Sequence, residues 1–404
     1  MNLSIGIAGM PNVGKSTLFN ALLKKTVAYA ANYPFATIEP NVGVVEVPDD
    51  RLPVLANIIA GGDPGSESGM TQRPSIVPAA VEFYDIAGLV KGASKGEGLG
   101  NKFLSHIREV AAIAHVVRLF EDPGIIHVSN KVDPVSDIQT VETELILADM
   151  ATLSKQHEPK GKASKEEIFL YEIVQKMEKK MDEGIMARNV QLDDEEKAAV
   201  KQLNLLTMKP VIYVFNVSEN QLSNMNETKK KIEEIFNQLD RHPELVSGSK
   251  RDPDLHRDDD PSYIYLNAKL ENDVLALSEE DQKAYLKEYG LEETGLNRLI
   301  KTAYSTLGLI SFLTAGEKSS SAKASERRGE VRAWTITKGT LAPQAAGVIH
   351  TDFEKHFIKA DIVPFKDFVE LDGWVKAREL GKVQSVGKDY VMKDDEVVEF
   401  KVGV

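Results

Sequence analysis

The sequence predicts an α/β protein built on a mostly parallel sheet, with an inserted helical arm and a small α+β module near its C-terminal end. One observation is the phosphate-loop pattern at Gly9–Ser16, which lies between a strand pattern and a helix pattern. The other is a series of short, β-branched apolar runs, most of them separated by helical patterns, as in parallel α/β sheets. These runs are Leu3–Ala8, Val42–Val47, Ala79–Tyr84, His115–Phe120, Val211–Phe215 and Tyr263–Leu266.

The helical arm is predicted over residues 136–204. Two series of apolar residues recur there at spacings of three and four: Ile138, Val141, Leu145 and Ala148, then Leu170, Val174, Met177 and Met181. Charged residues fill the other faces, and Glu158–Gly161 separates the two series. We expect two antiparallel helices that form a coiled-coil arm. The alternative is a pair of ordinary helices on the sheet, although neither segment is broadly apolar.

Three stretches rich in Gly, Pro, Ser and charge are expected to be surface loops. They are Gly61–Pro74, Arg241–Pro261 and Glu317–Gly329. Beyond the last loop, short strands at Val331–Thr337 and Val397–Val402 surround one expected helix near Phe353–Ile358, with Trp334 and Phe353 as core residues. We expect residues 309–404 to fold as a module of their own.

Composition narrows the class of protein. The chain has 404 residues, enough for two or three domains, and no cysteine, so disulfides and thiolate metal sites are impossible. The first residues lack the cationic flank of a signal peptide, and no apolar run reaches the roughly 20 residues of a membrane span. We expect a soluble, cytoplasmic protein with no membrane partner. Its net charge of −13 argues against charge-driven binding to nucleic acid and against sequence-specific DNA as a partner, although residues 317–404 are neutral.

The phosphate loop is the most specific motif in the chain. Gly9–Ser16 matches G-x-x-x-x-G-K-[ST] without departure. Backbone N–H groups and the positive end of the following helix dipole would hold phosphates, with Lys15 on the β- and γ-phosphates and the Ser16 hydroxyl on Mg²⁺. The predicted nucleotide-binding residues here are Asn12, Val13, Gly14, Lys15, Ser16 and Thr17, and Lys15 is also predicted to be catalytic. A chance glycine turn is the alternative.

Two further elements would complete a nucleotide switch. Asp85 ends the strand pattern at Ala79–Tyr84, so its carboxylate can hold Mg²⁺ through water, and Gly88 N–H can meet the γ-phosphate. Thr37 lies between the two motifs and is placed to supply a second hydroxyl to Mg²⁺. The predicted metal ligands are therefore Ser16, Thr37 and Asp85, and an ordinary loop threonine is the alternative for Thr37.

Four blocks of the sequence resemble the Obg-like ATPase (YchF) family. They are Gly9–Asn20, Asn32–Asn41, Asp85–Asn101 and Ala345–Lys355. The resemblance runs nearly end to end, and the three predicted loops are where the chain departs from it. It implies a P-loop domain of the OBG GTPase type over residues 1–135 and 205–308, the arm over 136–204, and a TGS domain of ubiquitin-like fold over 309–404. It also implies association with the ribosome or a ribosomal subunit, through ribosomal RNA or translation factors.

The residues that read the base are predicted at Asn216-Val217-Ser218-Glu219, directly after a strand pattern. Asn130–Asp133 spells the guanine-specific motif N-K-x-D, but too few residues precede it for the crossover that a further parallel strand needs. At the favoured position Glu219 replaces the aspartate that accepts bonds from guanine. This agrees with the N-x-x-E pattern and the ATP preference of the resembled family, which also places the Val217 backbone against the base and Asn267–Lys269 in the last nucleotide loop.

The sequence lacks the residue that usually positions the attacking water for nucleotide hydrolysis. Small GTPases carry glutamine just after D-x-x-G, but this chain has Leu89 there. The resemblance suggests His115 as the catalytic residue instead, and the alternative is a histidine packed in the core at the start of a strand. In related NTPases without the glutamine, an asparagine at the place of Asn12 helps to bind K⁺, so K⁺ is a second candidate cofactor beside Mg²⁺. For Asn12 the alternative is a loop residue that caps backbone groups.

Two classes of function remain. The first is an ATPase whose hydrolysis cycle, with Mg²⁺, switches a ribosome-bound partner. The second is a non-cycling, nucleotide-dependent binding module, which Leu89 keeps open. A GTPase would follow if Asn130–Asp133 read the base.

Overall fold

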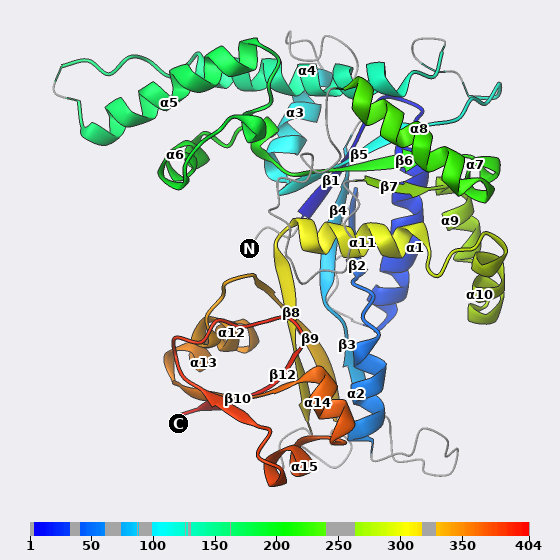
Figure 1. Ribbon diagram of the computed structural model, residues 1–404, viewed down its shortest axis with the longest axis vertical. Helices are drawn as coiled ribbons and strands as arrows, with labels where there is room; N and C mark the ends of the chain where they lie inside the picture. The colour runs from blue at the N-terminus through cyan, green and yellow to red at the C-terminus, as the bar shows by residue number, and fades with distance from the viewer. Residues whose placement is uncertain are drawn as a thin grey trace. The chain divides into compact units, whose positions relative to one another are not determined.

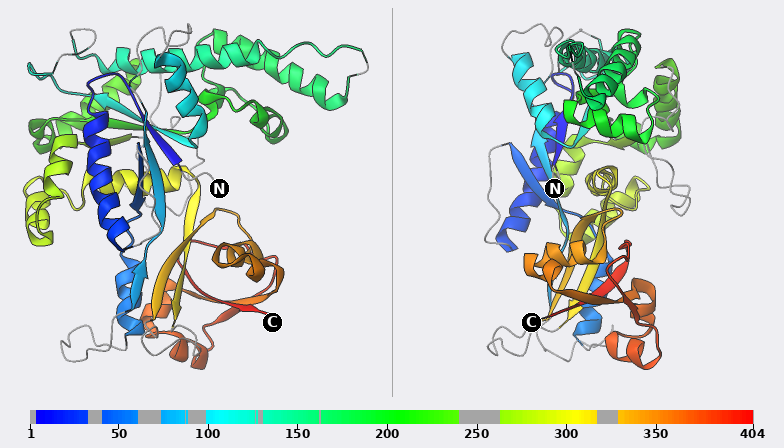
Figure 2. Two further views of the ribbon diagram at one scale, coloured as in Figure 1. Left: turned by 180° about the vertical axis from the view of Figure 1, so that it is seen from behind. Right: turned by 90° about the vertical axis from the view of Figure 1, so that its left-hand side faces the viewer.

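The computed structural model describes residues 4–32, 41–60, 74–86, 88, 99–125, 127, 131–161, 163–239, 263–316 and 329–403. Thr37, Leu89, Asn130 and nearly all of the three predicted loops lie outside these residues. The chain divides into two compact units. The first is Met1–Val45 with Val81–Thr306, and the second is Glu46–Ala80 with Leu307–Val404. Figures 1 and 2 show the ribbon in three views.

The first unit is built on a sheet whose described strands follow the spatial order β2–β4–β1–β5–β6–β7. These strands are β1 (Ser4–Ala8), β2 (Val42–Glu46), β4 (Ala80–Asp85), β5 (Ala112–Arg118), β6 (Val211–Asn216) and β7 (Tyr263–Leu266). Each corresponds to one of the apolar runs in the sequence, so the predicted strands are confirmed. β5 begins three residues earlier than predicted because the preceding residues are apolar and buried as well.

Four of the five pairs of neighbouring strands described in this sheet are parallel. β4, β1, β5, β6 and β7 pair in parallel, and β1, β5 and β6 are buried along their whole length, as expected for strands covered on both faces. β2 runs antiparallel to β4, because backbone bonds join Asn41 to Asp85 at one end and Val47 to Ala79 at the other. The predicted α/β class with a mostly parallel sheet is therefore confirmed.

Helices cover both faces of this sheet (Figure 1). They are α1 (Lys15–Asn32), α3 (Leu99–Glu109), α7 (Glu219–Ser223), α8 (Met225–Gln238), α9 (Ala268–Val274) and α11 (Gly295–Thr306), whereas α10 (Glu279–Glu288) lies away from the sheet. α8 packs Phe236 on Tyr213 of β6, whereas α1 and α11 lie together on the other face, where Lys25 bonds to Asn297. Among the helices described, none combines the length and the apolarity needed to cross a lipid bilayer.

The helical arm lies between β5 and β6 in the chain. Its elements are α4 (Pro134–Leu153), α5 (Lys165–Asp182), η2 (Ala187–Asn189), α6 (Asp194–Val200), η3 (Lys201–Leu203) and η4 (Leu206–Met208). Leu153 of α4, Val174 and Met177 of α5, and Val200 of α6 share one small core. The arm is thus stabilised by a core of its own, to which short helices contribute besides the two long ones.

The root of the arm packs on the sheet. Glu142 of α4 accepts a 2.5 Å hydrogen bond from the Tyr213 hydroxyl of β6. About two turns further along α4, the buried Asp149 carboxylate accepts bonds from Leu206 N–H, Thr207 N–H and the Thr207 hydroxyl, each 2.7 Å long. The first half of α4 therefore lies on the sheet, as in the alternative to the coiled-coil arm, and only its second half pairs with α5.

The second unit contains a sheet whose described strands follow the order β11–β10–β12–β8–β9–β3. They are β3 (Ser75–Val77), β8 (Leu309–Gly316), β9 (Glu330–Thr337), β10 (Phe357–Pro364), β11 (Gln384–Val386) and β12 (Glu396–Val402). β8 and β9 form an antiparallel hairpin, and β12 pairs with β8 in parallel. First and last strands of residues 309–404 thus lie side by side in the middle of the sheet, as in ubiquitin-like folds.

Helices also pack on this sheet: α2 (Arg51–Ile59), α12 (Ala342–Ile349), α13 (Thr351–Lys355), α14 (Phe365–Glu370) and α15 (Trp374–Glu379). Trp334 and Phe353 pack against the core under α12 as predicted. The expected helix near Phe353–Ile358 is wrong at its end, because Phe357 already begins strand β10. Phe357 and Ala360 are buried there on the same core.

Residues 46–80 belong to the second unit, although the sequence pattern places them in the P-loop domain. β3 extends the sheet by pairing with β9, and α2 buries Leu52 and Leu55 almost completely. Arg51 also lies 3.4 Å from the carboxylate of Asp394. The unit is therefore made from two segments that are far apart in the chain.

We expect a fragment of residues 307–404 to be much less stable than the same fragment joined to residues 46–80 by a Gly/Ser linker. Burial of Leu52 and Leu55 should raise the free energy of unfolding by about 3 kcal/mol or more. Urea unfolding followed by tryptophan fluorescence measures the difference. A linked control with Leu52→Asp and Leu55→Asp keeps the chain length and should lose the gain. Equal stability of all three fragments would contradict the assignment of residues 46–80 to this unit.

Candidate nucleotide-binding site

The phosphate loop joins the end of β1 to the start of α1, as the sequence predicts. Three of its residues have positive φ: Gly9 at 146°, Asn12 at 62° and Gly14 at 103°. Asparagine is one of the few non-glycine residues that tolerate this region. Ser16 and Thr17 are exposed in the first turn of α1. The loop therefore presents the N-terminus of a long helix, where phosphate groups bind favourably.

Lys15 lies beneath this loop with only 7% of its surface exposed. Its Nζ donates a 2.6 Å hydrogen bond to the Met10 carbonyl, so the side chain folds back along the loop. Burial lowers the pKa of Lys15 to about 8, opposed by the nearby carboxylate of Asp85. Burial likewise raises the pKa of Asp85, at the end of β4, and Lys15 opposes this shift. Both charges are thus poorly solvated, and added phosphate or cation would favour their ionised forms.

Gly88 brings the segment after β4 against the phosphate loop. A Cβ atom at Gly88 would lie 3.0 Å from Lys15 Nζ and 3.4 Å from Pro11 N, so a side chain there would crowd both groups. Lys15, Asp85 and Gly88 are therefore brought together, as the switch hypothesis requires. The third predicted metal ligand, Thr37, lies outside the described residues.

Asn216 at the end of β6 connects three loops through its side chain. Its Nδ2 donates a 2.9 Å hydrogen bond to the Val13 carbonyl in the phosphate loop, and its Oδ1 accepts a 3.1 Å bond from Ala268 N–H at the start of α9. A Cβ atom at Gly14 would lie 2.3 Å from Asn216 Nδ2, so glycine is required there. Asn216 therefore holds the phosphate loop against the two strand ends where the base is predicted to bind.

A second asparagine extends this connection. Asn267 Nδ2 donates a 2.8 Å bond to the Val217 carbonyl, while its Oδ1 accepts from Leu270 N–H and caps α9. Val217 N–H is also bonded, to the Leu266 carbonyl. The Val217 backbone is thus bonded to its neighbours in the sheet, whereas Glu219 is exposed as the first residue of α7.

The guanine-type motif at residues 130–133 does not follow a described strand of the sheet. β5 ends at Arg118, and the next described strand in the chain is β6 at Val211. Asp133 instead caps α4, where its carboxylate accepts a 3.1 Å bond from Ser136 N–H. The topological argument against this motif therefore agrees with the structure.

His115 lies in the middle of β5 with 2% of its surface exposed. In the sheet register it pairs with Ala8, the last residue before the phosphate loop. Its ring packs on Tyr213, at a centroid distance of 5.6 Å, on the face that α4 and α8 cover. This is the environment of a packed core histidine, and a catalytic ring would have to turn toward the edge of the sheet.

Two buried side chains support the site without a signal in the sequence motifs. Arg118 ends β5, and its guanidinium donates to the carbonyls of Phe120 and Ile125, which shapes the following loop. Glu271 of α9 accepts bonds from Gly295 N–H and Leu296 N–H and so caps α11. The sequence shows an arginine at the end of an apolar run, which could have drawn attention to Arg118, whereas the role of Glu271 depends on a contact between distant elements.

Few of the described side chains in this site could bind a metal ion, which fits a cation such as Mg²⁺ that takes most of its ligands from a bound phosphate and from water. In the part of the chain that the structure describes, no group of three or more His, Cys, Asp or Glu side chains could hold a metal ion. Asp85 and the Ser16 hydroxyl are oxygen ligands of the kind that Mg²⁺ prefers, and Mg²⁺ commonly takes its remaining ligands from phosphates and water.

Comparisons with known proteins cover both units. A family model described as "50S ribosome-binding GTPase" matches residues 4–147, and the model YchF-GTPase_C, described as "Protein of unknown function (DUF933)", matches residues 309–403. The chain is 45% identical over 410 residues to the "Ribosome-binding ATPase YchF" of Bacillus subtilis (strain 168) and 44% identical over 411 residues to that of Escherichia coli O157:H7, with 100% of each chain covered. The solved Schizosaccharomyces pombe YchF GTPase is similar in structure, with a TM-score of 0.79 and 35% identity over 99% of this chain and 98% of that chain.

We expect Asn216→Ala to weaken ATP binding and lower stability together. The change leaves the Val13 carbonyl and Ala268 N–H without their partner, at a cost of about 1–3 kcal/mol for each buried polar group. Urea unfolding and ATP titration by calorimetry measure the two effects. Asn220→Ala, in an exposed part of α7, is the matched control and should change neither. If Asn216→Ala binds ATP normally, the connection between the loops does not organise the site.

Proposed function

This chain belongs to the YchF family, and on that premise we propose that it is an ATPase that binds Mg²⁺–ATP at Gly9–Ser16 and associates with ribosomes. The observation that carries the proposal is the connected site: Asn216 joins the phosphate loop to the strand ends where Glu219 lies. The names of the bacterial relatives, ribosome-binding ATPases at 45% and 44% identity, support the activity and the partner.

In this proposal each residue of the site has a defined task. Backbone N–H groups of the loop bind the phosphates, Lys15 neutralises charge on the β- and γ-phosphates, and Gly88 N–H contacts the γ-phosphate. Ser16 and Asp85 hold Mg²⁺, with Thr37 as the further hydroxyl ligand. Bound Mg²⁺ would neutralise charge that develops on the phosphate oxygens. Asn12, exposed with positive φ, is the proposed contact to K⁺.

The choice of ATP over GTP rests on Glu219. The names of the similar proteins do not decide between ATP and GTP. The matching family model and the Schizosaccharomyces pombe structure are called GTPases, whereas the bacterial relatives are called ATPases. Guanine requires an acceptor for N1–H and the N2 amino group in fixed positions. Glu219 is one methylene longer than the usual aspartate and is exposed at the start of α7. Asp133, the other candidate, is engaged in capping α4.

The protein should sediment with purified ribosomes in a nucleotide-dependent manner, with ATP and GTP giving different results at equal concentrations. A bound γ-phosphate can accept a hydrogen bond from Gly88 N–H, and a difference in this contact between nucleotide states would change affinity for the partner. Co-sedimentation with ATP, GTP, ADP or no nucleotide measures it. Lys15→Ala should abolish the response to ATP.

Two outcomes would contradict parts of this proposal. A response to GTP alone that disappears in Asp133→Ser, a variant that keeps a capping side chain, would make the chain a GTPase. Ribosome binding that is the same in all four conditions would contradict the switch. If ATP is also not hydrolysed, the non-cycling binding module would be favoured.

We also propose His115 as the residue that orients the attacking water in place of the missing glutamine. Its support is the register with Ala8, which places it one residue from the phosphate loop across the sheet. His115→Ala should lower ATP turnover about 10²–10⁴-fold while ATP affinity stays nearly constant. Turnover is measured at a temperature where circular dichroism shows the variant to be folded, because packing on Tyr213 is also lost. Normal turnover under this condition would assign the histidine to the core.

A further inference from the structure

The tip of the helical arm carries a concentration of positive charge in an acidic protein. In the sequence, residues 155–165 contain four lysines and one glutamate, whereas the whole chain has a net charge of −13. Of these lysines, Lys155, Lys160 and Lys165 are described and exposed. We call these three lysines and His157 the arm tip. It lies between the end of α4 at Leu153 and the start of α5 at Lys165.

The lysines of the arm tip differ from others along the arm. Lys176, Lys180 and Lys197 each lie within 4.0 Å of a carboxylate, on Glu196, Glu183 and Asp194. No such ion pair involves the three described lysines of the arm tip in the described part of the chain. The neighbouring Glu167 carboxylate is occupied with the capping box of α5, where it accepts from Ser164 N–H at 2.8 Å. The tip lysines are therefore exposed and outside ion pairs, although the carboxylates of Glu158, Glu166 and Glu167 lie near them in the chain.

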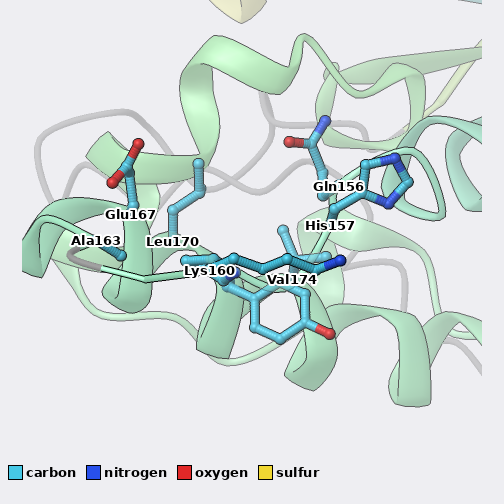
Figure 3. Close-up of a pocket in the computed structure, with 9 residues that line it drawn as sticks. Gln156, His157, Lys160, Ala163, Glu167, Leu170 and Val174 are labelled. Atoms are coloured by element: carbon cyan, nitrogen blue, oxygen red, sulfur yellow. The ribbon is translucent and has the colours of Figure 1, made fainter.

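A cavity of about 250 Å³ opens beside these charges (Figure 3). His157 and Lys160 line it from the connection between the helices, and Leu170, Tyr171 and Val174 line it from α5. Figure 3 shows the Lys160 side chain extended across the cavity, with His157 at one side and Glu167 at the other. The cavity thus combines an aromatic ring, an imidazole and an apolar floor with one cationic side chain, Lys160, and one carboxylate, Glu167.

We propose that the arm tip binds a single-stranded or looped segment of RNA, with one base in the cavity against Tyr171 and the backbone phosphates on Lys155, Lys160 and Lys165. The inference rests on the proposed association with ribosomes and names the surface and the chemistry of that contact. Unpaired bases stack on aromatic side chains while lysines follow the phosphates, and this is how proteins recognise single-stranded RNA.

The form of the cavity favours RNA over an acidic protein segment. Carboxylates on a peptide could pair with the exposed lysines alone and would leave the ring-lined cavity without a function. The high negative charge of the whole chain repels polyanions in general. The cluster of exposed lysines outside ion pairs at the end of the arm is a place where this repulsion is reduced.

The test uses the full chain and a fluorescein-labelled uridine 12-mer, with binding followed by fluorescence anisotropy at several salt concentrations. Lys155→Glu/Lys160→Glu alters the rim, and Tyr171→Ala alters the cavity. The matched control is Lys179→Glu/Lys201→Glu, which makes the same change in charge at exposed arm lysines that are also outside ion pairs. ATP turnover should be equal in all variants because none of these residues touches the phosphate loop.

The tip double variant should bind the 12-mer at least about tenfold more weakly, with the salt dependence reduced by about one to two counterions. Tyr171→Ala should bind about fivefold more weakly or worse with the salt dependence unchanged. The control should bind within about twofold of the unaltered chain. Absence of RNA binding by the unaltered chain, or equal losses in both double variants, would overturn the proposal.

Ribosome co-sedimentation of the same proteins separates this inference from the proposed function. Loss of sedimentation in the tip double variant, with retention in the control, supports the arm tip as the contact. If that variant loses ribosomes while the unaltered chain does not bind the 12-mer, the tip contacts a ribosomal protein and the RNA assignment is overturned. Failure of the unaltered chain to sediment with ribosomes, despite tip-dependent RNA binding, would count against the proposed ribosome association alone.

Discussion

The Asn216 side chain is the contact on which the nucleotide site depends. One planar amide joins the phosphate loop through Val13 to the start of α9 through Ala268, and it is buried between them. The loop has positive φ at three residues and would be costly to hold in one conformation by its own contacts. Asn216 also explains why Gly14 cannot carry a side chain. The rigid sheet thereby determines where the phosphates and the base can lie relative to each other.

Much of the first unit could be predicted because its determinants are local. Parallel strands that are buried on both faces appear as continuous apolar runs, and all six runs are strands in the structure. The phosphate loop is recognisable for a related reason, since each glycine, Lys15 and Ser16 has a task that only one or two residue types can perform. Asn130–Asp133 could be excluded as the base-reading motif by counting residues, because too few residues follow β5 for a crossover to another parallel strand. The roles of the site residues in catalysis and metal binding remain predictions.

Features that depend on distant contacts could not be predicted. Residues 46–80 complete a sheet with strands that lie more than two hundred residues further along the chain, and nothing in their own pattern indicates this partner. The sequence does not show which face of the sheet the His115 side chain occupies. β5 is buried on both faces, so its residues do not alternate between apolar and polar, and only the structure shows that His115 packs on Tyr213. α4 follows one periodic pattern but packs on the sheet in its first half and on α5 in its second.

The division of the second unit into two segments has a consequence during synthesis. β3 and α2 leave the ribosome before residues 81–306 have been made, and their partners β8 and β9 follow later still. At about 5–20 residues per second, the delay is on the order of ten seconds or more. During this time α2 can contact β3 but lacks its later partners β8, β9 and α14, and the first unit acquires its complete sequence earlier. Translation thus produces an intermediate in which the first unit can be folded while the second is still open, a state that chaperones could recognise.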